Sequence, residues 1–288
     1  MEPRSVVLVE RPKVAIAGRR RTGSRWWLRV GLILLVIFWT APLLYLALLS
    51  VTSQGEMLSG RLWPENPYWE NWPIAFRTVP LVSFLRNSIV AATLSSLVTV
   101  LLSFPLAYAV VRLQVGGGIL PSLVLASYAA PPIVAAIPLF FLLRGVGLID
   151  HVFGLILVYG MANVPVAFYL LDNFLLRIPA EIEEAACLDG AGTLRTLVTV
   201  VLPLVAPGVV ATGIICAILA YNEFLFAVLF TYSPKAQTLP VGLSLYQGER
   251  LVQYGQMAVA SLVGIAPVYV LGGLLQRWLI GGLTGGIK

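Results

Sequence analysis

The sequence has few charged residues and few of the side chains on which catalysis usually depends. Only 11% of its 288 residues are charged, whereas an ordinary soluble domain has about 25%. At the same time 59% of the residues are hydrophobic, which is more apolar surface than a soluble fold of this size can bury. The low charge therefore excludes a typical soluble enzyme and indicates a protein that lies in lipid.

The scarcity of reactive side chains excludes further classes. Two cysteines, Cys187 and Cys216, give no disulfide framework, and we expect the single histidine, His151, to be an exposed loop residue rather than a metal ligand. No Gly-x4-Gly-Lys-Ser/Thr phosphate loop occurs in these 288 residues. No nucleophile with a base is visible in the apolar runs. We therefore expect no catalytic residue, no metal site and no cofactor in this chain, and no hydrolysis of ATP by it.

Six apolar runs are long enough to cross a bilayer, which takes about 20 residues as a helix. They predict an all-α membrane protein with spans at about 28–49, 88–111, 119–143, 152–171, 204–230 and 257–280. The first run exceeds the core of about 7–15 residues that a signal peptide has, so we expect an uncleaved span. Three prolines in the third run predict a kink there.

Basic residues predict the orientation of the spans. Eight of the nineteen lie in residues 1–29, which explains the net charge of +6 without a nucleic-acid partner. If this end is cytoplasmic, the inner segments carry thirteen basic residues and the outer segments six, as the positive-inside rule requires. The sequence thus predicts a basic cytoplasmic tail at 1–27 and one membrane domain at 28–288, with both termini cytoplasmic.

Two polar segments between spans differ in what they predict. The turn-rich segment 51–83 contains several tryptophans and is interpreted as a loop at the membrane interface, with a binding site as the less favoured alternative. The loop 172–203 is the longest charged internal one. In it a proline and three acidic residues (179–184) predict a helix start, and Asp189-Gly190 predicts a turn. Physical arguments alone allow either a partner-binding loop or an interfacial loop without a partner.

The series of residues in this loop resembles the EAA motif of permease subunits of binding-protein-dependent ABC importers. That motif is Glu-Ala-Ala, three residues, Gly, nine residues, an aliphatic residue, any residue and Leu-Pro, and here Val200 is the aliphatic residue. The resemblance implies a type I ABC importer permease fold with six transmembrane helices and a coupling helix that docks in a cleft of an ATP-hydrolysing subunit. The docking residues that it implies are Glu184, Ala185, Ala186, Asp189, Gly190, Leu202 and Pro203.

Other segments are similar to the carbohydrate-uptake, maltose-type branch of this family, and in particular to its smaller permease subunit. They are Tyr221 to Phe224, Thr238 to Leu243 and Gln276 to Lys288. The similarity covers about residues 28–288 and implies a prokaryotic inner-membrane protein. The implied partners are a second homologous permease, two ATP-binding subunits that hold ATP and Mg²⁺, and an extracytoplasmic substrate-binding protein. The implied substrate is a di- or oligosaccharide such as maltose or trehalose, with glycerol-3-phosphate as the alternative.

Polar residues inside the spans are candidates for the translocation path. A charge at the bilayer centre costs at least about 2.5 kcal/mol, so Glu223 requires an explanation. Asn222 and Glu223 either line a path or gate, or form a hydrogen-bonded pair that fixes helix packing. Asn163 is a weaker path candidate. The alternative function is an ion-coupled secondary transporter or channel, which would work without an ATPase and usually has a repeat and several intramembrane charges.

Overall fold

The computed structural model describes residues 26–61, 63–248 and 252–284. Within these residues the all-α prediction is confirmed, since the ordered backbone is helical apart from one isolated bridge between Gln247 and Val252. The predicted basic tail falls almost wholly in residues 1–25, which lie outside the described residues. Within the described residues, those up to Leu44 and those from Tyr45 onward form two separate compact units.

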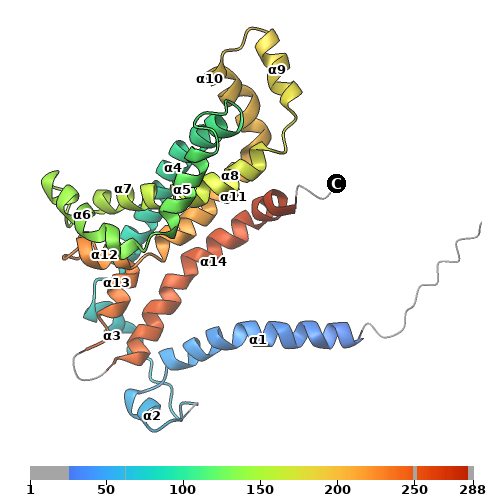
Figure 1. Cartoon of the computed structure of the whole chain (residues 1–288). Coiled ribbons are helices and arrows are strands. Elements are labelled where there is room, and N and C mark those ends of the chain that lie inside the picture. Colours follow the sequence, from blue (N-terminus) through green and yellow to red (C-terminus); the bar gives the residue numbers. More distant parts are fainter. Residues whose placement is uncertain (1–25, 62, 249–251, 285–288) are drawn as a thin grey trace, which may run out of the picture. The chain divides into compact units, whose positions relative to one another are not determined.

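The helices follow one another along the chain with short links (Figure 1). Their bounds are α1 (Trp26–Ser50), α2 (Gln54–Leu58), α3 (Asn71–Thr78), α4 (Leu81–Val111), α5 (Ile119–Ala129), α6 (Pro132–Gly145), α7 (Val152–Ala162), α8 (Val164–Leu175), α9 (Ala180–Leu188), α10 (Thr193–Thr196), a π-helical turn (Leu197–Val201), α11 (Leu202–Tyr221), α12 (Leu225–Phe230), α13 (Leu239–Ser244) and α14 (Tyr254–Thr284).

The described part of the chain has three helices that are long and apolar enough to cross a membrane, or up to five spans if each of two bent helix pairs counts as one. The three are α1, α4 and the run from Thr193 to Tyr221. The pairs are α5 with α6 and α7 with α8, and they correspond to the third and fourth spans expected from the sequence. The sixth expected span falls in α14, of which Tyr254–Val270 is a shorter apolar helix.

The third expected span is broken rather than kinked. Helices α5 and α6 meet at 95°, and Ala130 and Pro131 between them have extended backbone angles. A residue that precedes a proline is driven out of the helical conformation, and here both Pro131 and Pro132 exert this effect. Pro138, in contrast, lies inside α6.

Other helices extend beyond the apolar runs that predict them. Helix α4 begins at Leu81 rather than at 88, and the fifth span is helical from Thr193 rather than from 204. Hydropathy marks only the part of a helix that suits lipid, whereas backbone hydrogen bonding continues into polar residues. The fifth span is also interrupted, because α11 ends at Tyr221 and α12 begins at Leu225.

Helix α4 is the centre of the unit formed by residues 45–288, where it packs against α7, α8 and α11. Small and hydroxyl-bearing residues allow the close contact with α7. Thr99 donates a hydrogen bond to the carbonyl oxygen of Gly160 at 2.9 Å, and a Cβ at Gly160 would lie only 2.7 Å from Val98. Small residues at helix contacts are the usual means of packing helices in lipid.

Candidate functional site

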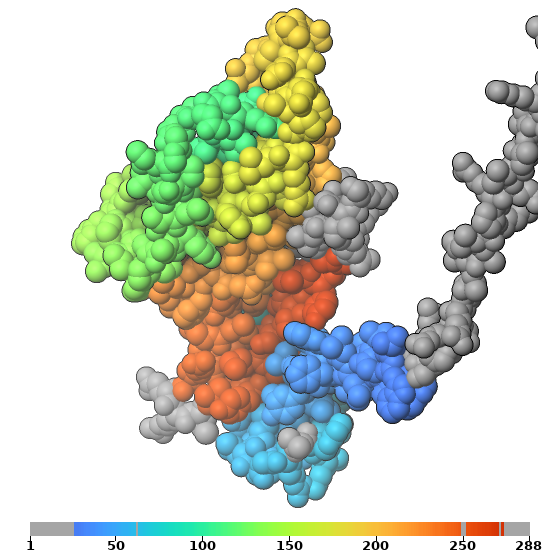
Figure 2. All heavy atoms as spheres, turned by 45° about the vertical axis from the view of Figure 1, so that its right-hand side comes forward, coloured from blue at the N-terminus to red at the C-terminus, as the bar shows by residue number. Residues whose placement is uncertain are grey.

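The loop between α8 and α11 forms a helix–turn–helix at one end of the unit formed by residues 45–288 (Figure 1). Pro179 precedes α9, and Glu181 and Glu183 lie in its first turn, where acidic side chains oppose the helix dipole. The helix ends at Asp189 and Gly190. Gly190 has φ +81°, a left-handed conformation that glycine adopts without strain. The space-filling view shows this loop, in yellow, projecting from the rest of the unit (Figure 2).

A buried ion pair holds α9 against the end of α4. Glu183 is only 8% exposed, and its Oε1 lies 2.6 Å from Nε of Arg112. The hydroxyl of Tyr108 donates a hydrogen bond to Oε2 of Glu183 at 2.9 Å. Because Tyr108 and Arg112 lie one turn apart at the end of α4, both oxygens of the carboxylate bind to the same helix end.

Arg112 also binds the link between α8 and α9. Its Nη2 donates hydrogen bonds to the carbonyl oxygens of Leu175 at 3.0 Å and Ile178 at 2.6 Å. The guanidinium therefore joins the ends of α4 and α8 to the first turn of α9. We call Tyr108, Arg112 and Glu183 the anchor cluster.

The sequence-based candidates lie on the outer surface of this loop. Glu184, Ala185, Asp189 and Gly190 are exposed, and Ala186 is half-buried. Their apolar neighbours are exposed as well, since Leu188 is 89% exposed and Leu194 is 73% exposed. We call residues 184–194 the loop tip. It presents acidic, small and apolar side chains that contact little else in this chain.

Leu202 and Pro203 occupy a different place from the other motif residues. They begin α11, directly after the π-helical turn Leu197–Val201. Leu202 packs against the buried cluster that includes Phe168 and Val201. The structure thus places these two residues at the base of the loop rather than at its tip.

Sequence reasoning missed the anchor cluster. It selected Glu184, whereas the preceding residue, Glu183, is the buried one. Adjacent residues on a helix lie about 100° apart, so one can be exposed while its neighbour is buried. The only sequence signal for this cluster is that three acidic residues, at 181, 183 and 184, occur in a loop on the same predicted side of the membrane as Arg112 at the end of the second span.

The candidate path residues Asn222 and Glu223 lie at the break between α11 and α12. The Glu223 carboxylate accepts hydrogen bonds from the backbone N–H of Phe226 at 3.1 Å and of Ala227 at 3.3 Å. Asn222 is exposed, and its Nδ2 donates to the carbonyl oxygen of Ile218 at 2.8 Å. The two side chains therefore each bond to their own backbone and not to one another. An acidic group at the start of α12 is stabilised by these N–H groups.

Asn163 lies at the other helix break, where α7 and α8 meet at 45°. It is half-buried and is both the C-cap residue of α7 and the N-cap residue of α8. Tyr159, one turn earlier, is buried, and its hydroxyl has no hydrogen-bond partner among the described residues. Helix α7 contacts α12 and α8 contacts α11, so the two broken spans pack against one another.

Asp150 joins the link before α7 to the link after α12. Its Oδ1 accepts hydrogen bonds from the backbone N–H of Tyr232 at 2.8 Å and of Ser233 at 2.9 Å. Partial burial by itself raises the pKa of this carboxyl, but the hydrogen bonds and the charge of Lys235 outweigh burial and hold the pKa below its ordinary value. The neighbouring His151 is exposed and accepts a hydrogen bond from the N–H of Phe153 at 3.1 Å.

Comparison with known proteins places the chain in a family. Residues 15–284 match the family described as binding-protein-dependent transport system inner membrane component. The match begins before residue 28, so part of the expected tail lies within the family region.

Curated relatives cover most of the chain. It is 36% identical over 251 residues to the sulfoquinovosyl glycerol transport system permease protein SmoH of Agrobacterium fabrum, which covers 86% of this chain and 88% of that protein. It is 32% identical over 272 residues to the trehalose/maltose transport system permease protein MalG of Thermococcus litoralis, with 93% and 98% covered.

A solved structure shares the fold. The crystal structure of a bacterial ABC transporter involved in the import of the acidic polysaccharide alginate contains a chain that matches with a TM-score of 0.72 at 23% identity, covering 88% of this chain and 96% of that one. This likeness confirms the importer permease fold, and the family match confirms the resemblance expected from residues 184–203. The chain therefore belongs to the inner-membrane permease components of binding-protein-dependent ABC importers.

Proposed function

We propose that this chain forms half of the transmembrane pathway of an ATP-driven sugar importer. A second homologous permease would form the other half, two ATP-binding subunits would hold ATP and Mg²⁺, and an extracytoplasmic binding protein would deliver the substrate. The observation that carries the proposal is the loop tip, an exposed surface of acidic, small and apolar residues on a helix that a buried ion pair fixes to α4. Sugar as the substrate class is supported by the names of the relatives at 36% and 32% identity.

The loop tip is proposed to dock in a cleft of one ATPase subunit. Ala185, Ala186 and Gly190 leave a smooth surface that a partner can approach closely, and Leu188 offers an apolar side chain that is 89% exposed. Glu184 is exposed and would pair with a basic residue of the partner. Apolar side chains exposed beside polar ones are typical of protein–protein contacts.

Movement of the docked tip would reach the spans through the anchor cluster. Closure of the ATPase subunits would pull α9, and the bonds of Arg112 and Tyr108 to Glu183 would transmit the pull to α4. Helix α4 packs against α7, α8 and α11, so these helices would move with it. Alternating access requires that ATP favours one arrangement of the spans over the other. The breaks at Asn163 and at Asn222–Glu223 are proposed to lie along the path or gate.

The proposal includes an orientation of the chain in the membrane. The loop tip and both termini would be cytoplasmic, as the distribution of basic residues predicts. Residues 231–256 would face outward and meet the binding protein. The C-terminal tail, which is proposed to reach the ATPase dimer, ends in residues 285–288, and these lie outside the described residues.

The test is uptake into proteoliposomes that contain both permeases, with and without the ATPase subunits. Radiolabelled maltose, trehalose and glycerol-3-phosphate are offered with the binding protein outside and ATP inside. The proposal predicts accumulation of a sugar only when ATP and both ATPase subunits are present. Accumulation driven by an ion gradient alone would contradict it and favour the secondary-transporter alternative. ATP-driven uptake of glycerol-3-phosphate without uptake of a sugar would support an ATP-driven importer but contradict sugar as its substrate class.

A further inference from the structure

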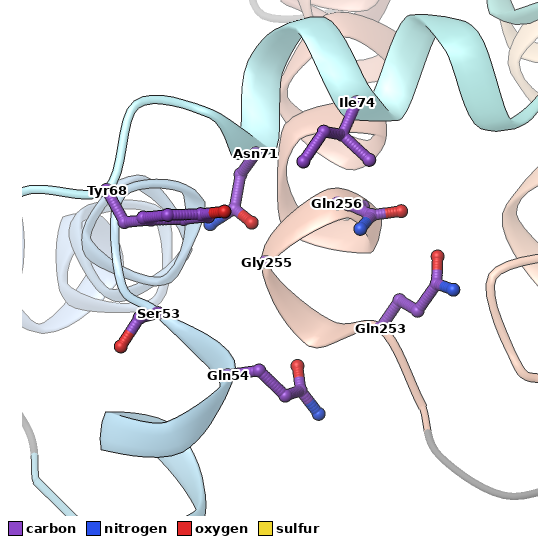
Figure 3. A pocket seen from close by; sticks show the side chains of 8 residues that line it. All are labelled: Ser53, Gln54, Tyr68, Asn71, Ile74, Gln253, Gly255 and Gln256. Carbon is purple, nitrogen blue, oxygen red and sulfur yellow. The ribbon is translucent and has the colours of Figure 1, made fainter.

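A polar pocket lies at the end of the unit opposite to the loop tip. It has a volume of about 330 Å³, at the lower end of the roughly 300–1,000 Å³ typical of small-molecule sites. Three segments far apart in the sequence form it, namely the start of α2, the segment that leads into α3, and the start of α14 (Figure 3). The residues that line it are Ser53, Gln54, Tyr68, Asn71, Ile74, Gln253, Gly255 and Gln256.

Asn71 fixes the walls of this pocket. Its buried Nδ2 donates hydrogen bonds to the carbonyl oxygens of Ser50 at 3.2 Å and Thr52 at 2.9 Å, which ties α3 to the end of α1. Gly255 allows α14 to approach the start of α3, because a Cβ at this position would collide with the Asn71 side chain. Gln54 completes the wall, since its Nε2 donates to the carbonyl oxygen of Val252 at 2.8 Å. The pocket is therefore built by specific contacts.

The lining retains hydrogen-bonding groups for a ligand. Gln253 has a buried Oε1 that accepts no hydrogen bond from the described residues. Gln54 uses its Nε2 and keeps its Oε1 as an acceptor, whereas Gln256 accepts from Thr78 and keeps its Nε2 as a donor. Buried acceptors in proteins usually have a partner, so this oxygen is a candidate acceptor for a ligand.

The chemistry of the lining selects the class of ligand. None of the eight lining residues is charged, so a phosphate or carboxylate would lose its hydration without gaining a cation. Amide side chains supply both donors and acceptors, which suits hydroxyl groups that also do both. Tyr68 adds an aromatic ring, shown beside Asn71 in Figure 3, for the apolar face of a sugar ring.

We propose that this pocket is an entry site that binds one ring of a neutral sugar on the outer face of the permease. The inference rests on the proposed function for its orientation, and it narrows the substrate class to uncharged sugars. It also changes the interpretation of the segment 51–83, from which five of the lining residues come. The sequence favoured a simple interface loop there.

Binding is measured on the complete complex of both permeases and both ATPase subunits, without the binding protein. The complex is placed in phosphatidylcholine nanodiscs free of dodecyl maltoside, because that detergent carries a sugar headgroup. Saturation-transfer NMR with millimolar trehalose and maltose reports contact with the protein. We expect both sugars to give signals and glycerol-3-phosphate to give none. Absence of both sugar signals, or an equal signal from glycerol-3-phosphate, would overturn the proposal.

Variants assign the signal to the pocket. The double variant Gln54→Leu with Gln253→Leu removes two amides and should weaken trehalose binding about tenfold or more, as the loss of two hydrogen bonds implies. Gln237→Leu is the matched control, since Gln237 is not among the lining residues. If the double variant does not fold, the isosteric Gln253→Glu replaces it, and its added charge should weaken binding in the same direction. Equal binding by wild type and pocket variant, or equal loss in the control, refutes the site.

Two further arms separate the remaining sources of error. Nanodiscs that contain a glycosyl diacylglycerol test whether a lipid headgroup supplies the sugar ring. Trehalose binding in phosphatidylcholine nanodiscs, which contain no glycolipid, supports the free sugar as the ligand. Signals from the glycolipid headgroup without any from trehalose contradict it. If uptake depends on ATP but the pocket variant binds trehalose as the wild type does, the entry site is refuted and the proposed function is not. Uptake driven by an ion gradient alone would instead refute the proposed function.

Discussion

Removal of the Glu183 carboxylate should both destabilise the permease and uncouple it from its ATPase. In Glu183→Ala, Arg112 keeps its bonds to two carbonyl oxygens but loses its charged partner, and Tyr108 loses its acceptor. The two side chains of the pair are only 16% and 11% exposed, and breaking a buried pair by removing one partner costs about 3–5 kcal/mol. For a chain of this size that free energy corresponds to a fall in Tm of roughly 6–20 °C.

The two cysteines provide an assay for this loss. Cys216 is buried and Cys187 is exposed, so in a Cys187→Ser background a thiol-reactive fluorophore labels Cys216 only as the helices separate. The midpoint of labelling against temperature gives Tm. Glu184→Ala is the matched control, because Glu184 is exposed on the same helix, and its Tm should stay within about 2 °C of the parent, as for most surface substitutions.

Coupling is measured in Glu183→Ala and in its Cys187→Ser parent at a temperature at which both remain folded. The ratio of sugar molecules transported to ATP hydrolysed should fall in Glu183→Ala, because the pull on α9 no longer reaches α4. A Tm equal to that of the control would refute the buried pair as a stabilising contact. A lower Tm with an unchanged transport ratio would refute the anchor cluster as the link between the ATPase and the spans.

Four other substitutions test further contacts and surfaces of the chain. Gly190→Trp places a large side chain on the loop tip at a position with positive φ, and Glu184→Lys reverses the charge there. Both variants should abolish stimulation of the ATPase by the binding protein while the chain still inserts into the membrane. Normal stimulation would show that the tip is not the docking surface. The Asp150 carboxyl has a lowered pKa in the folded state, so its bonds contribute stability above the usual value of about 3.9 and lose it as the pH falls through the folded value. The Tm difference between wild type and Asp150→Asn should therefore shrink on acidification below pH of about 4, and a difference that grows instead would contradict the assignment. Gly160→Ala should lower the free energy of unfolding by about 1–3 kcal/mol through overpacking, because the added Cβ would lie 2.7 Å from Val98 on α4. At Gly145 an added Cβ would have no atom within 4 Å, so Gly145→Ala should leave the stability unchanged. Equal Tm values in both variants would refute the close contact of α4 with α7.

The sequence predicts most of the helices and the helical loop between α8 and α11 because these depend on local patterns. Apolar runs identify the spans, and the residues from 184 to 203 identify the loop without reference to any distant part of the chain. The ends of the helices are less well predicted, since α4 and the fifth span continue into stretches that mix apolar residues with polar and charged ones. Hydropathy does not measure backbone hydrogen bonding.

The helix breaks and the anchor cluster depend on more than local patterns. Asn163 interrupts an otherwise apolar span, and a single amide gives hydropathy no reason to divide it. Prolines predicted a kink near residue 131, but the 95° angle depends on two successive prolines acting together. Glu183 differs from Glu184 only in facing Arg112, which lies in another helix. The polar pocket requires three distant segments, so no single stretch of sequence indicates it.

The most direct test of the account is a photo-crosslinking measurement at the loop tip. A photoreactive amino acid replaces Leu188, which is 89% exposed, and in a matched variant it replaces Leu123 on α5, which is 61% exposed. The complete complex is irradiated in proteoliposomes, and the products are separated by mass. The account predicts a covalent product with the ATPase subunit from position 188 and none from position 123. No product with the ATPase from position 188, or equal products from both positions, would contradict it.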